Sequence, residues 1–377
     1  MKAAVLTAPR TLEVLDVPVP PLAPHHVRVR MSGVGICGTD LHIYGGQSNY
    51  NLDAAGHAIP LAAQPQILGH EMSGVIVEVG REVRDLRVGD RVLLDQGLNC
   101  YSQRRQPICE YCASGDSHQC LYYQEIGITG VAGGFAEYVN IPATNAVPVE
   151  GDLPPDELPL AEPLGCILHA VELSERMCPR YTFTGERRVG NVLILGAGPA
   201  GLLFLQYLRN VRGFDGPIFV ADLNPAKLAL AESFGGIPMS ATGDGLVGEI
   251  IERTHGEKIH YLIEATGAGA VFRFMPMLLR RQATVMLYGH GHEGADMTLL
   301  NYLQYLEPFL VAPTGASGRL DADGRPVTYR TSVQHVVSGQ VRVGPMITHR
   351  CELQTLPRVF ASDYSRPEFV KAVLLPR

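Results

Sequence analysis

Four cysteines lie close together in the sequence, and the last three follow a C-x2-C-x7-C pattern. They are Cys100, Cys109, Cys112 and Cys120. Four thiolates around one Zn²⁺ close a tetrahedral site with no open position, which is the arrangement of a structural rather than a catalytic zinc. The segment 101–106 can loop out while Cys100 still reaches the metal, because loop-closure entropy rises slowly with loop length. A disulfide or a set of unrelated thiols is the alternative interpretation.

A second, separate group of residues could hold a catalytic metal. Cys37 opens the motif Cys-Gly-Thr-Asp-Leu-His, and His70 lies within Gly-His-Glu. A thiolate and an imidazole supply two ligands of an open zinc site, which needs one more protein ligand. Glu162, in an Ala-Glu-Pro segment at the expected domain junction, is one candidate, and Glu71 is the other. The residues alone leave this choice open.

A glycine-rich segment points to a nucleotide. It reads Gly196, Ala197, Gly198, Pro199, Ala200 and Gly201, which fits G-x-G-x-x-G. The segment follows a continuous apolar run and precedes another apolar stretch, so backbone amides and a helix N-terminus can approach a pyrophosphate. A glycine turn needed only for helix packing is the alternative.

The identity of the nucleotide is suggested by Asp222, which lies at the end of the next expected strand. A carboxylate at this position accepts hydrogen bonds from both ribose hydroxyls of NAD. It would repel a 2′-phosphate, and the next residues, Leu223 and Asn224, provide no arginine to bind one. The sequence therefore favours NAD over NADP.

Two kinds of periodicity divide the chain. Alternating apolar residues predict strands in the first part, whereas continuous apolar strands alternating with helices predict a parallel sheet in the second. The strands are expected at 27–31, 74–79, 91–92, 134–139, 191–195, 217–222, 261–265, 283–288, 309–312 and 372–375, and the helices at 166–176, 202–208, 225–234 and 332–338. The fold class is thus α/β: a β-rich domain, to which the C-terminal tail returns, and a doubly wound parallel-sheet domain.

Composition narrows the range of functions. The 377 residues carry 31 basic and 38 acidic side chains, and this mild acidity argues against a nucleic-acid or membrane surface as partner. No apolar run approaches the roughly 20 residues that span a bilayer, and the start of the chain lacks a signal-peptide pattern. A cytoplasmic location is expected, where clustered cysteines indicate metal binding more often than disulfides.

The order of the motifs resembles that of the zinc-dependent medium-chain dehydrogenases, and within them the sorbitol (polyol) and threonine dehydrogenase branch. The motifs are C-G-T-D-x-H, G-H-E, G-D-R-V, the cysteine lobe, G-G-F-A-E-Y, E-P-L and G-A-G-P-A-G, and they span nearly the whole chain. The resemblance implies a GroES-like domain (1–162 and 316–377) with two zinc ions and a Rossmann domain (163–315) that binds NAD. It also implies a homodimer or homotetramer acting on a small-molecule alcohol.

The resemblance assigns roles at the catalytic metal. Cys37 and His70 resemble two of the zinc ligands. Glu71 resembles the glutamate that binds zinc directly in sorbitol dehydrogenases and approaches it from outside in other members. Glu162 falls where alcohol dehydrogenases place a second ligand cysteine and polyol enzymes place a glutamate. The position of Cys100 corresponds to the first cysteine of the family's structural lobe.

Three residues between the two candidate ligands resemble the family's proton-handling group. Thr39 resembles the hydroxyl that takes the alcohol proton, and His42 the imidazole that relays it to solvent. Asp40 resembles the carboxylate that orients the histidine ligand. The stretch 49–66 is longer than is usual in the family. We expect it to help select the substrate, and a solvated surface insertion is the alternative.

The predicted function is the zinc-dependent oxidation of a hydroxylated secondary alcohol (a polyol, cyclitol or sugar-like molecule) to a ketone, with hydride transfer to NAD. An amino-alcohol (threonine-like) or aldose dehydrogenase is the alternative within this reaction class. A non-catalytic NAD-binding regulatory protein is the alternative from another class. It is disfavoured because Cys37, His70 and Thr39 are all present.

Overall fold

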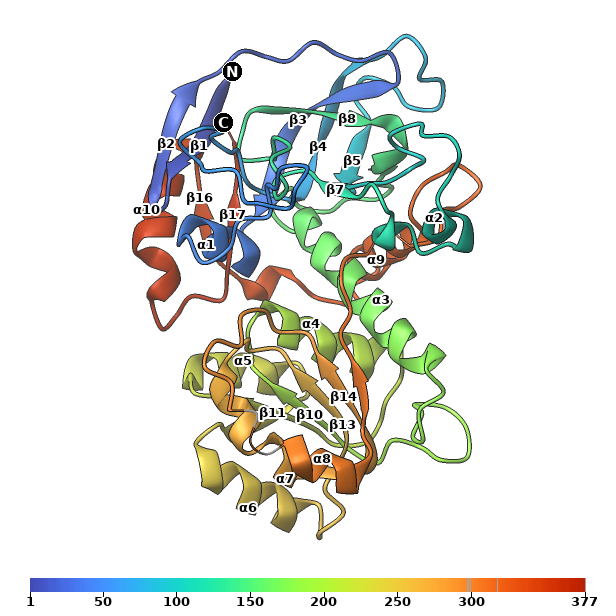
Figure 1. Ribbon diagram of the computed structural model, residues 1–377, viewed down its shortest axis with the longest axis vertical. Helices are drawn as coiled ribbons and strands as arrows, with labels where there is room; N and C mark the ends of the chain where they lie inside the picture. The colour runs from blue at the N-terminus through green and yellow to red at the C-terminus, as the bar shows by residue number, and fades with distance from the viewer. Residues whose placement is uncertain (297, 299, 317, 377) are drawn as a thin grey trace. The chain divides into compact units, whose positions relative to one another are not determined.

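The computed structural model describes residues 1–296, 298, 300–316 and 318–376, and the chain forms two compact units (Figure 1). Unit 1 comprises Met1–Cys166, Gly315–Gly339 and Val343–Arg377, and unit 2 comprises Ile167–Thr314 and Gln340–Arg342. The sequence predicts boundaries at 162/163 and 315/316 between a zinc-binding and an NAD-binding domain. The division by function stays a prediction.

Unit 1 is built on a seven-stranded sheet in the order β16-β17-β3-β4-β5-β9, with β8 paired to β3. Its strands are β3 (His26–Gly35), β4 (Glu71–Val79), β5 (Arg91–Leu94), β8 (Tyr138–Pro142), β9 (Ala146–Pro148), β16 (Ile347–Cys351) and β17 (Lys371–Leu374). All neighbours are antiparallel except β16 and β17. The C-terminal strand β17 pairs with β3, so the tail is part of this unit.

One predicted strand of this unit was placed too early. The prediction ran over 134–139, but β8 begins only at Tyr138. The backbone N–H groups of Gly134 and Phe135 donate instead to the carbonyls of Gly69 and Leu68, at 2.7 and 3.0 Å. These residues are thus extended, but they are bound to the segment before β4 rather than to a neighbouring strand.

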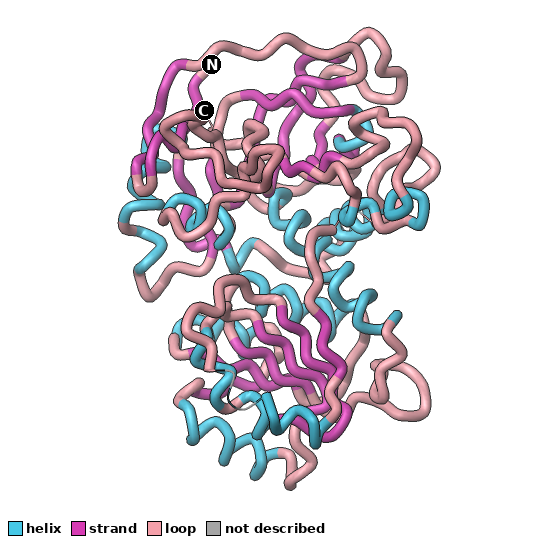
Figure 2. Tube along the Cα trace, viewed as in Figure 1, coloured by secondary structure: helices cyan, strands magenta, loops and turns pink. Residues whose placement is uncertain are grey.

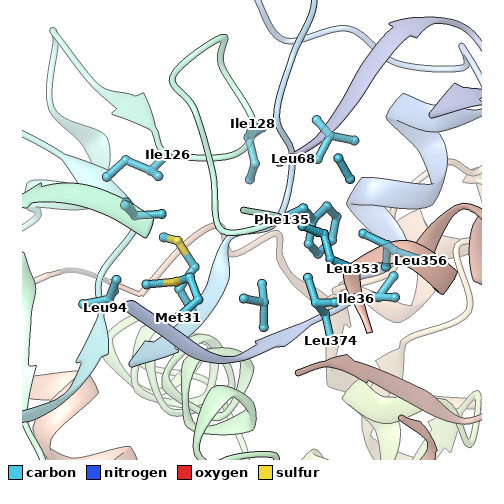
Figure 3. Packing of buried hydrophobic residues seen from close by; sticks show 14 of the residues in the cluster. Met31, Ile36, Leu68, Leu94, Ile126, Ile128, Phe135, Leu353, Leu356 and Leu374 are labelled. Atoms are coloured by element: carbon cyan, nitrogen blue, oxygen red, sulfur yellow. The ribbon is translucent and has the colours of Figure 1, made fainter. Parts of the chain in front are cut away.

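Short elements complete unit 1. They are β1 (Lys2–Ala8), β2 (Thr11–Asp16), α1 (Gly38–Tyr44), β6 (Gly97–Leu98), α2 (Glu110–Ser114), β7 (Gln124–Glu125), α9 (Val327–Val337) and α10 (Leu356–Ala361). Helix α9 overlaps the predicted helix at 332–338, but it begins five residues earlier and ends at Val337. The apolar core of the unit gathers side chains from the sheet, from the segment after β7 and from α10 (Figure 3).

Unit 2 contains a six-stranded, all-parallel sheet in the order β12-β11-β10-β13-β14-β15. The strands are β10 (Val192–Leu195), β11 (Ile218–Asp222), β12 (Ile237–Ser240), β13 (Ile259–Glu264), β14 (Leu279–Leu287) and β15 (Phe309–Val311). The strands lie side by side in Figure 2. The order reverses beside β10, as expected for a doubly wound fold, and this confirms the predicted α/β class.

Helices of unit 2 connect these strands. They are α4 (Pro199–Gln206), α5 (Pro225–Ser233), α6 (Gly243–Arg253), α7 (Met275–Leu278) and α8 (Leu300–Leu306). Helix α3 (Ala161–Arg176) begins in unit 1 and continues into unit 2, five residues before the predicted start at Cys166. Its first turn carries Glu162. Within the described part of the chain, no helix is long and apolar enough to cross a membrane.

Candidate functional site

The four clustered cysteines converge on one point in unit 1. The sulfurs of Cys100, Cys109, Cys112 and Cys120 all lie within 4.8 Å of one another, and all four residues are buried. Cys120 Sγ is 3.6 Å from Cys100 Sγ and 3.8 Å from Cys109 Sγ. Zn–S bonds of about 2.3 Å place the sulfurs of a tetrahedron a little under roughly 4 Å apart. The geometry therefore fits a closed zinc site, and the thiols are not joined as disulfides.

Backbone groups also prepare this cluster for a cation. The N–H of Cys109 donates to Cys100 Sγ at 3.5 Å, and that of Tyr122 to Cys120 Sγ at 3.4 Å. Burial alone would raise the pKa of Cys109, but N–H groups of Cys112 and Leu121 lower it to about 6, whereas burial raises the pKa of Cys112 and of Cys120. Such N–H donors stabilise thiolates, which are the form that binds zinc.

The second predicted set is also brought together in unit 1. One ligand atom from each of Cys37, His70 and Glu71 lies within 4.8 Å of the others. Cys37 is the N-cap of α1, His70 precedes β4, and Glu71 is the first residue of β4. His70 and Glu71 are buried, while Cys37 is partly exposed. A partly open site with a thiolate, an imidazole and a carboxylate is the donor set of a catalytic zinc.

Asp40 anchors this site from behind. Its fully buried carboxylate accepts hydrogen bonds from the N–H of Cys37 at 2.9 Å and of Gly69 at 3.1 Å. Asp40 Oδ1 also lies 3.4 Å from His70 Nδ1. Burial alone would lower the pKa of His70, but Asp40 and Cys37 raise it well above its usual value. One carboxylate therefore fixes the backbone of Cys37 itself and of Gly69, the residue before His70, and faces the imidazole.

Glu71 shows most directly that a cation fits here. Its Oε1 accepts from Lys371 Nζ at 2.5 Å, whereas its Oε2 is buried with no hydrogen-bond partner among the described residues. A Cβ added at Gly35 would lie 1.9 Å from this Oε2, so a glycine is needed beside it. A buried carboxylate oxygen without a partner is costly unless a cation or a donor occupies the site.

Glu162, the rival candidate, lies just outside this group of three. Its Oε1 accepts from Gln96 Nε2 at 2.8 Å and from the Tyr329 hydroxyl at 3.4 Å. Burial raises the pKa of Glu162 to about 7, with His70 opposing the rise and Glu71 adding to it. Glu162 is thus an electrostatic neighbour of the site that is already held by two side chains.

The predicted proton path begins on α1. Thr39 Oγ1 lies 3.8 Å from Cys37 Sγ, which places the hydroxyl beside the candidate ligand. His42 follows one turn later, so the two side chains lie on one helix face. Its Nδ1 is 2.9 Å from Gln47 Oε1, and the residue is partly exposed. A proton relay requires a hydroxyl near the metal ligands and an imidazole nearer to solvent, and Thr39 and His42 are arranged in this order.

Most polar residues of the 49–66 loop are occupied within the loop itself. Asn49 bonds to Ile59 and to the N–H of Asn51, and Asp53 accepts from the N–H groups of Ala55 and His57. Asn51 differs, because its buried Nδ2 has no partner among the described residues. Hydrogen bonds within the loop therefore order it, and the Asn51 side-chain amide keeps a donor that a ligand could use.

The glycine turn of unit 2 follows β10 and opens α4. Gly196 has φ +102°, and a Cβ at Gly201 would lie 1.9 Å from the carbonyl oxygen of Gly196, so both positions need glycine. No atom lies within 4 Å of a Cβ built at Gly198, the N-cap of α4. Pro199 and Ala200 form the first turn of the helix. Space thus remains where a pyrophosphate would approach the helix N-terminus.

Asp222 ends β11, next to this turn. Its Oδ2 accepts from the N–H of Ala197 at 2.7 Å and its Oδ1 from the N–H of Asn224 at 2.8 Å. The carboxylate is therefore held at the carboxyl edge of the sheet, where dinucleotides bind in doubly wound folds.

Sequence reasoning missed the residues that support the carboxylates. They are Gln96, Tyr329 and Lys371. Only Lys371 left a signal, as a single charge within the apolar run 369–375. Gln96 and Tyr329 are ordinary polar residues whose partners lie far away in the chain.

Comparison with known proteins places this geometry in a family. The model of the alcohol dehydrogenase GroES-like domain matches residues 23–151, and that of zinc-binding dehydrogenases matches residues 199–308. The L-threonine 3-dehydrogenase of Anaeromyxobacter sp. (strain Fw109-5) is 31% identical, covering 92% of this chain and 90% of the relative. The sorbitol dehydrogenase of Arabidopsis thaliana is 29% identical, covering 92% and 87%.

Solved structures agree. A protein described as a zinc-binding dehydrogenase, from Sinorhizobium meliloti 1021 and bound to NADP, superposes with a TM-score of 0.80 at 26% identity, covering 100% of this chain and 99% of the other. Galactitol-1-phosphate dehydrogenase from Escherichia coli shares the fold, with a TM-score of 0.81 at 24% identity and full coverage of both chains. With two metal-competent clusters and a dinucleotide turn, the chain belongs to the zinc-dependent medium-chain dehydrogenase family and is an NAD(P)-linked alcohol dehydrogenase.

Proposed function

We propose that this enzyme oxidises a hydroxylated secondary alcohol, of the polyol, cyclitol or sugar-like class, to a ketone with NAD as hydride acceptor. The observation that carries the proposal is the set of Cys37, His70 and Glu71, with the unpartnered Glu71 Oε2 buried beside a thiol and an imidazole. Cys37, His70 and Glu71 would hold a zinc ion, which when bound makes the alcohol hydroxyl acidic.

The residues of this chain then handle the proton. The Thr39 hydroxyl accepts the alcohol proton, and His42 passes it towards solvent, which is a general-base path. Asp40 holds the backbone of Cys37 at the start of α1 and of Gly69, the residue before His70, so the candidate ligands are fixed in place. Glu162, bound to Gln96 and Tyr329, keeps a second carboxylate beside the substrate site.

The cofactor preference rests on Asp222. Its carboxylate is fixed at the carboxyl edge of the sheet by two backbone N–H groups, where it would accept from ribose hydroxyls. The Sinorhizobium neighbour binds NADP. A 2′-phosphate near Asp222 would meet like charge, and no arginine stands at 223 or 224. NAD is therefore the proposed cofactor.

The substrate class rests on the carboxylates. Polyol enzymes of this family place a glutamate where simple-alcohol enzymes place a cysteine, and this chain has Glu162 there. An amino alcohol is the second candidate, because the matched relatives include several L-threonine 3-dehydrogenases.

The test is a substrate panel of polyols, cyclitols, aldoses, amino alcohols and simple alkanols, read by NADH absorbance. We expect the wild type to oxidise a polyol-class secondary alcohol and Cys37→Ser to oxidise no alcohol. A variant with residues 52–58 shortened should have a raised KM for the same substrate. A site built on hydrogen bonds rejects an analogue lacking one hydroxyl strongly. If ethanol is oxidised as well as any polyol and trimming the loop changes nothing, the assignment of substrate class is wrong.

A further inference from the structure

Glu125, the last residue of β7, faces the candidate metal site. Its neighbours Ile126 and Ile128 point into the apolar core of unit 1 (Figure 3), and both are buried. Because side chains alternate along a strand, Glu125 points to the side opposite to Ile126. The chain turns directly afterwards, where Gly127 has φ +83°. In this turn the backbone of Gly127 packs against Gly69, since a Cβ at Gly127 would lie 2.5 Å from the carbonyl oxygen of Gly69. Gly69 directly precedes His70.

The other neighbours of Glu125 also belong to the site. The N–H of Ile126 donates to the carbonyl of Gln96 at 2.9 Å, and the Gln96 side chain binds Glu162. Burial raises the pKa of Glu125 while His70 opposes the rise, and Glu125 in turn contributes to the raised pKa of Cys166. Cys166 Sγ lies 3.5 Å from Glu162. Glu125 is thus within electrostatic reach of two members of the site.

The carboxylate of Glu125 is unpaired in the part of the chain that the structure describes. It makes no hydrogen bond or ion pair with any residue that the structure describes, although only part of the residue is exposed. The backbone of Glu125 is fixed nevertheless, because its N–H donates to the Thr129 hydroxyl oxygen at 2.8 Å and it pairs with Gly97 in the β6–β7 ladder. A partly buried carboxylate held in place without a partner is positioned to accept hydrogen bonds from a ligand.

We propose that Glu125 is a substrate-binding residue that accepts a hydrogen bond from a donor group next to the reacting carbinol. This inference rests on the proposed function and names the contact that selects its substrate. The donor is a hydroxyl in a polyol or an ammonium in an amino alcohol, and a carboxylate binds both. A simple alkanol offers no such donor, so Glu125 would favour substituted alcohols over plain ones.

Three probes of one carbon skeleton test this contact: butan-2-ol, butane-2,3-diol and 3-aminobutan-2-ol. The measurement is kcat/KM with NAD for the zinc-loaded wild type, Glu125→Gln and Glu125→Ala. We expect Glu125→Ala to lower kcat/KM about ten- to one-hundredfold for the probe that carries the recognised donor, and less than about twofold for butan-2-ol. Glu125→Gln separates the donors, because an amide still accepts from a hydroxyl but loses the attraction to an ammonium.

Gln124→Ala is the matched control, since Gln124 is the exposed neighbour in β7 and points the other way. Gln124→Ala should leave kcat/KM for each of the three probes within about twofold of the wild-type value. An equal loss of kcat/KM for all three probes in Glu125→Ala would indicate a structural role and overturn the inference. Ratios of kcat/KM between the probes that match those of the wild type would also overturn it. Without NADH formation from any alcohol by the wild type, the proposed function fails and this inference falls with it. Wild-type turnover with unchanged ratios overturns the inference alone.

Discussion

Lys371 and Glu71 form a buried ion pair across β3, the strand that lies between their own strands in the sheet. Lys371 Nζ lies 2.5 Å from Glu71 Oε1, and the two side chains are 3% and 1% exposed. Their strands, β17 and β4, both pair with β3, where Gly35 is the register partner of Glu71. Because Gly35 has no side chain, the pair can meet beside it. The lysine thereby holds one carboxylate oxygen and leaves the other beside Cys37 and His70.

Replacing Lys371 with methionine should destabilise the protein strongly. The change keeps an unbranched side chain but leaves Glu71 Oε1 buried without its charged partner, and breaking a buried ion pair typically costs about 3–5 kcal/mol. We expect the midpoint of urea unfolding to fall clearly. Far-UV circular dichroism measures the unfolding. Lys2→Met is the control: Lys2 is also 2.5 Å from its partner Asp16, but those side chains are 45% and 74% exposed. An equal shift in both variants would show that burial of the pair is unimportant.

The two metal sites should respond differently to removal of one ligand. Cys112→Ser should release one zinc per chain and lower the melting temperature, because binding at a structural site is coupled to folding. Cys37→Ser should abolish turnover and leave melting nearly unchanged, since α1 and β4 are held by Asp40 and the sheet. Elemental analysis of unchelated wild-type protein should give two zinc ions per chain. One or none would contradict the assignment of both sites.

Asp222→Ala should narrow the preference for NAD over NADP. The carboxylate would lose its hydrogen bonds to the ribose hydroxyls, and hydrogen bonds to charged groups contribute roughly 1.5–3 kcal/mol. We expect kcat/KM for NAD to fall about tenfold or more, while that for NADP changes little or rises. Asp222→Asn is the paired variant, because it keeps an acceptor and removes the charge. Comparable kcat/KM values for the two cofactors in the wild type would refute the assignment.

Local patterns predicted the fold class for a physical reason. Alternation and continuous apolar runs report directly on burial, so the parallel sheet of unit 2 was placed from the sequence. The glycine turn and the cysteine spacing are also local, and the structure brings each set together.

Long-range partners left no such pattern. The segment at 134–139 reads as a strand, but its first residues bond to Leu68 and Gly69 rather than to a ladder. Gln96 and Tyr329 support Glu162 from positions far away in the chain. Glu125 gave no signal either, because the packing of Gly127 on Gly69, which brings this segment beside His70, joins segments far apart in the chain.

The last prediction concerns acid stability and His26 in β3. Burial, with smaller effects of His25 and Arg104, lowers the pKa of His26 to about 4. In the unfolded chain a histidine takes up its proton near pH 6.5. The unfolded state therefore binds more protons between these values, so stability falls as the pH drops from about 6.5 to 4.

His26→Asn removes this group and should reduce the acid sensitivity. We expect the loss of stability between pH 7 and pH 5 to be smaller in the variant by roughly 1 kcal/mol, allowing for the partial exposure of His26. Zinc ligands also take up protons in this range, but they are common to both proteins, so the difference between the two isolates His26. The readout is the urea midpoint at each pH. Parallel pH profiles for wild type and His26→Asn would show that the folded and unfolded states protonate this histidine alike.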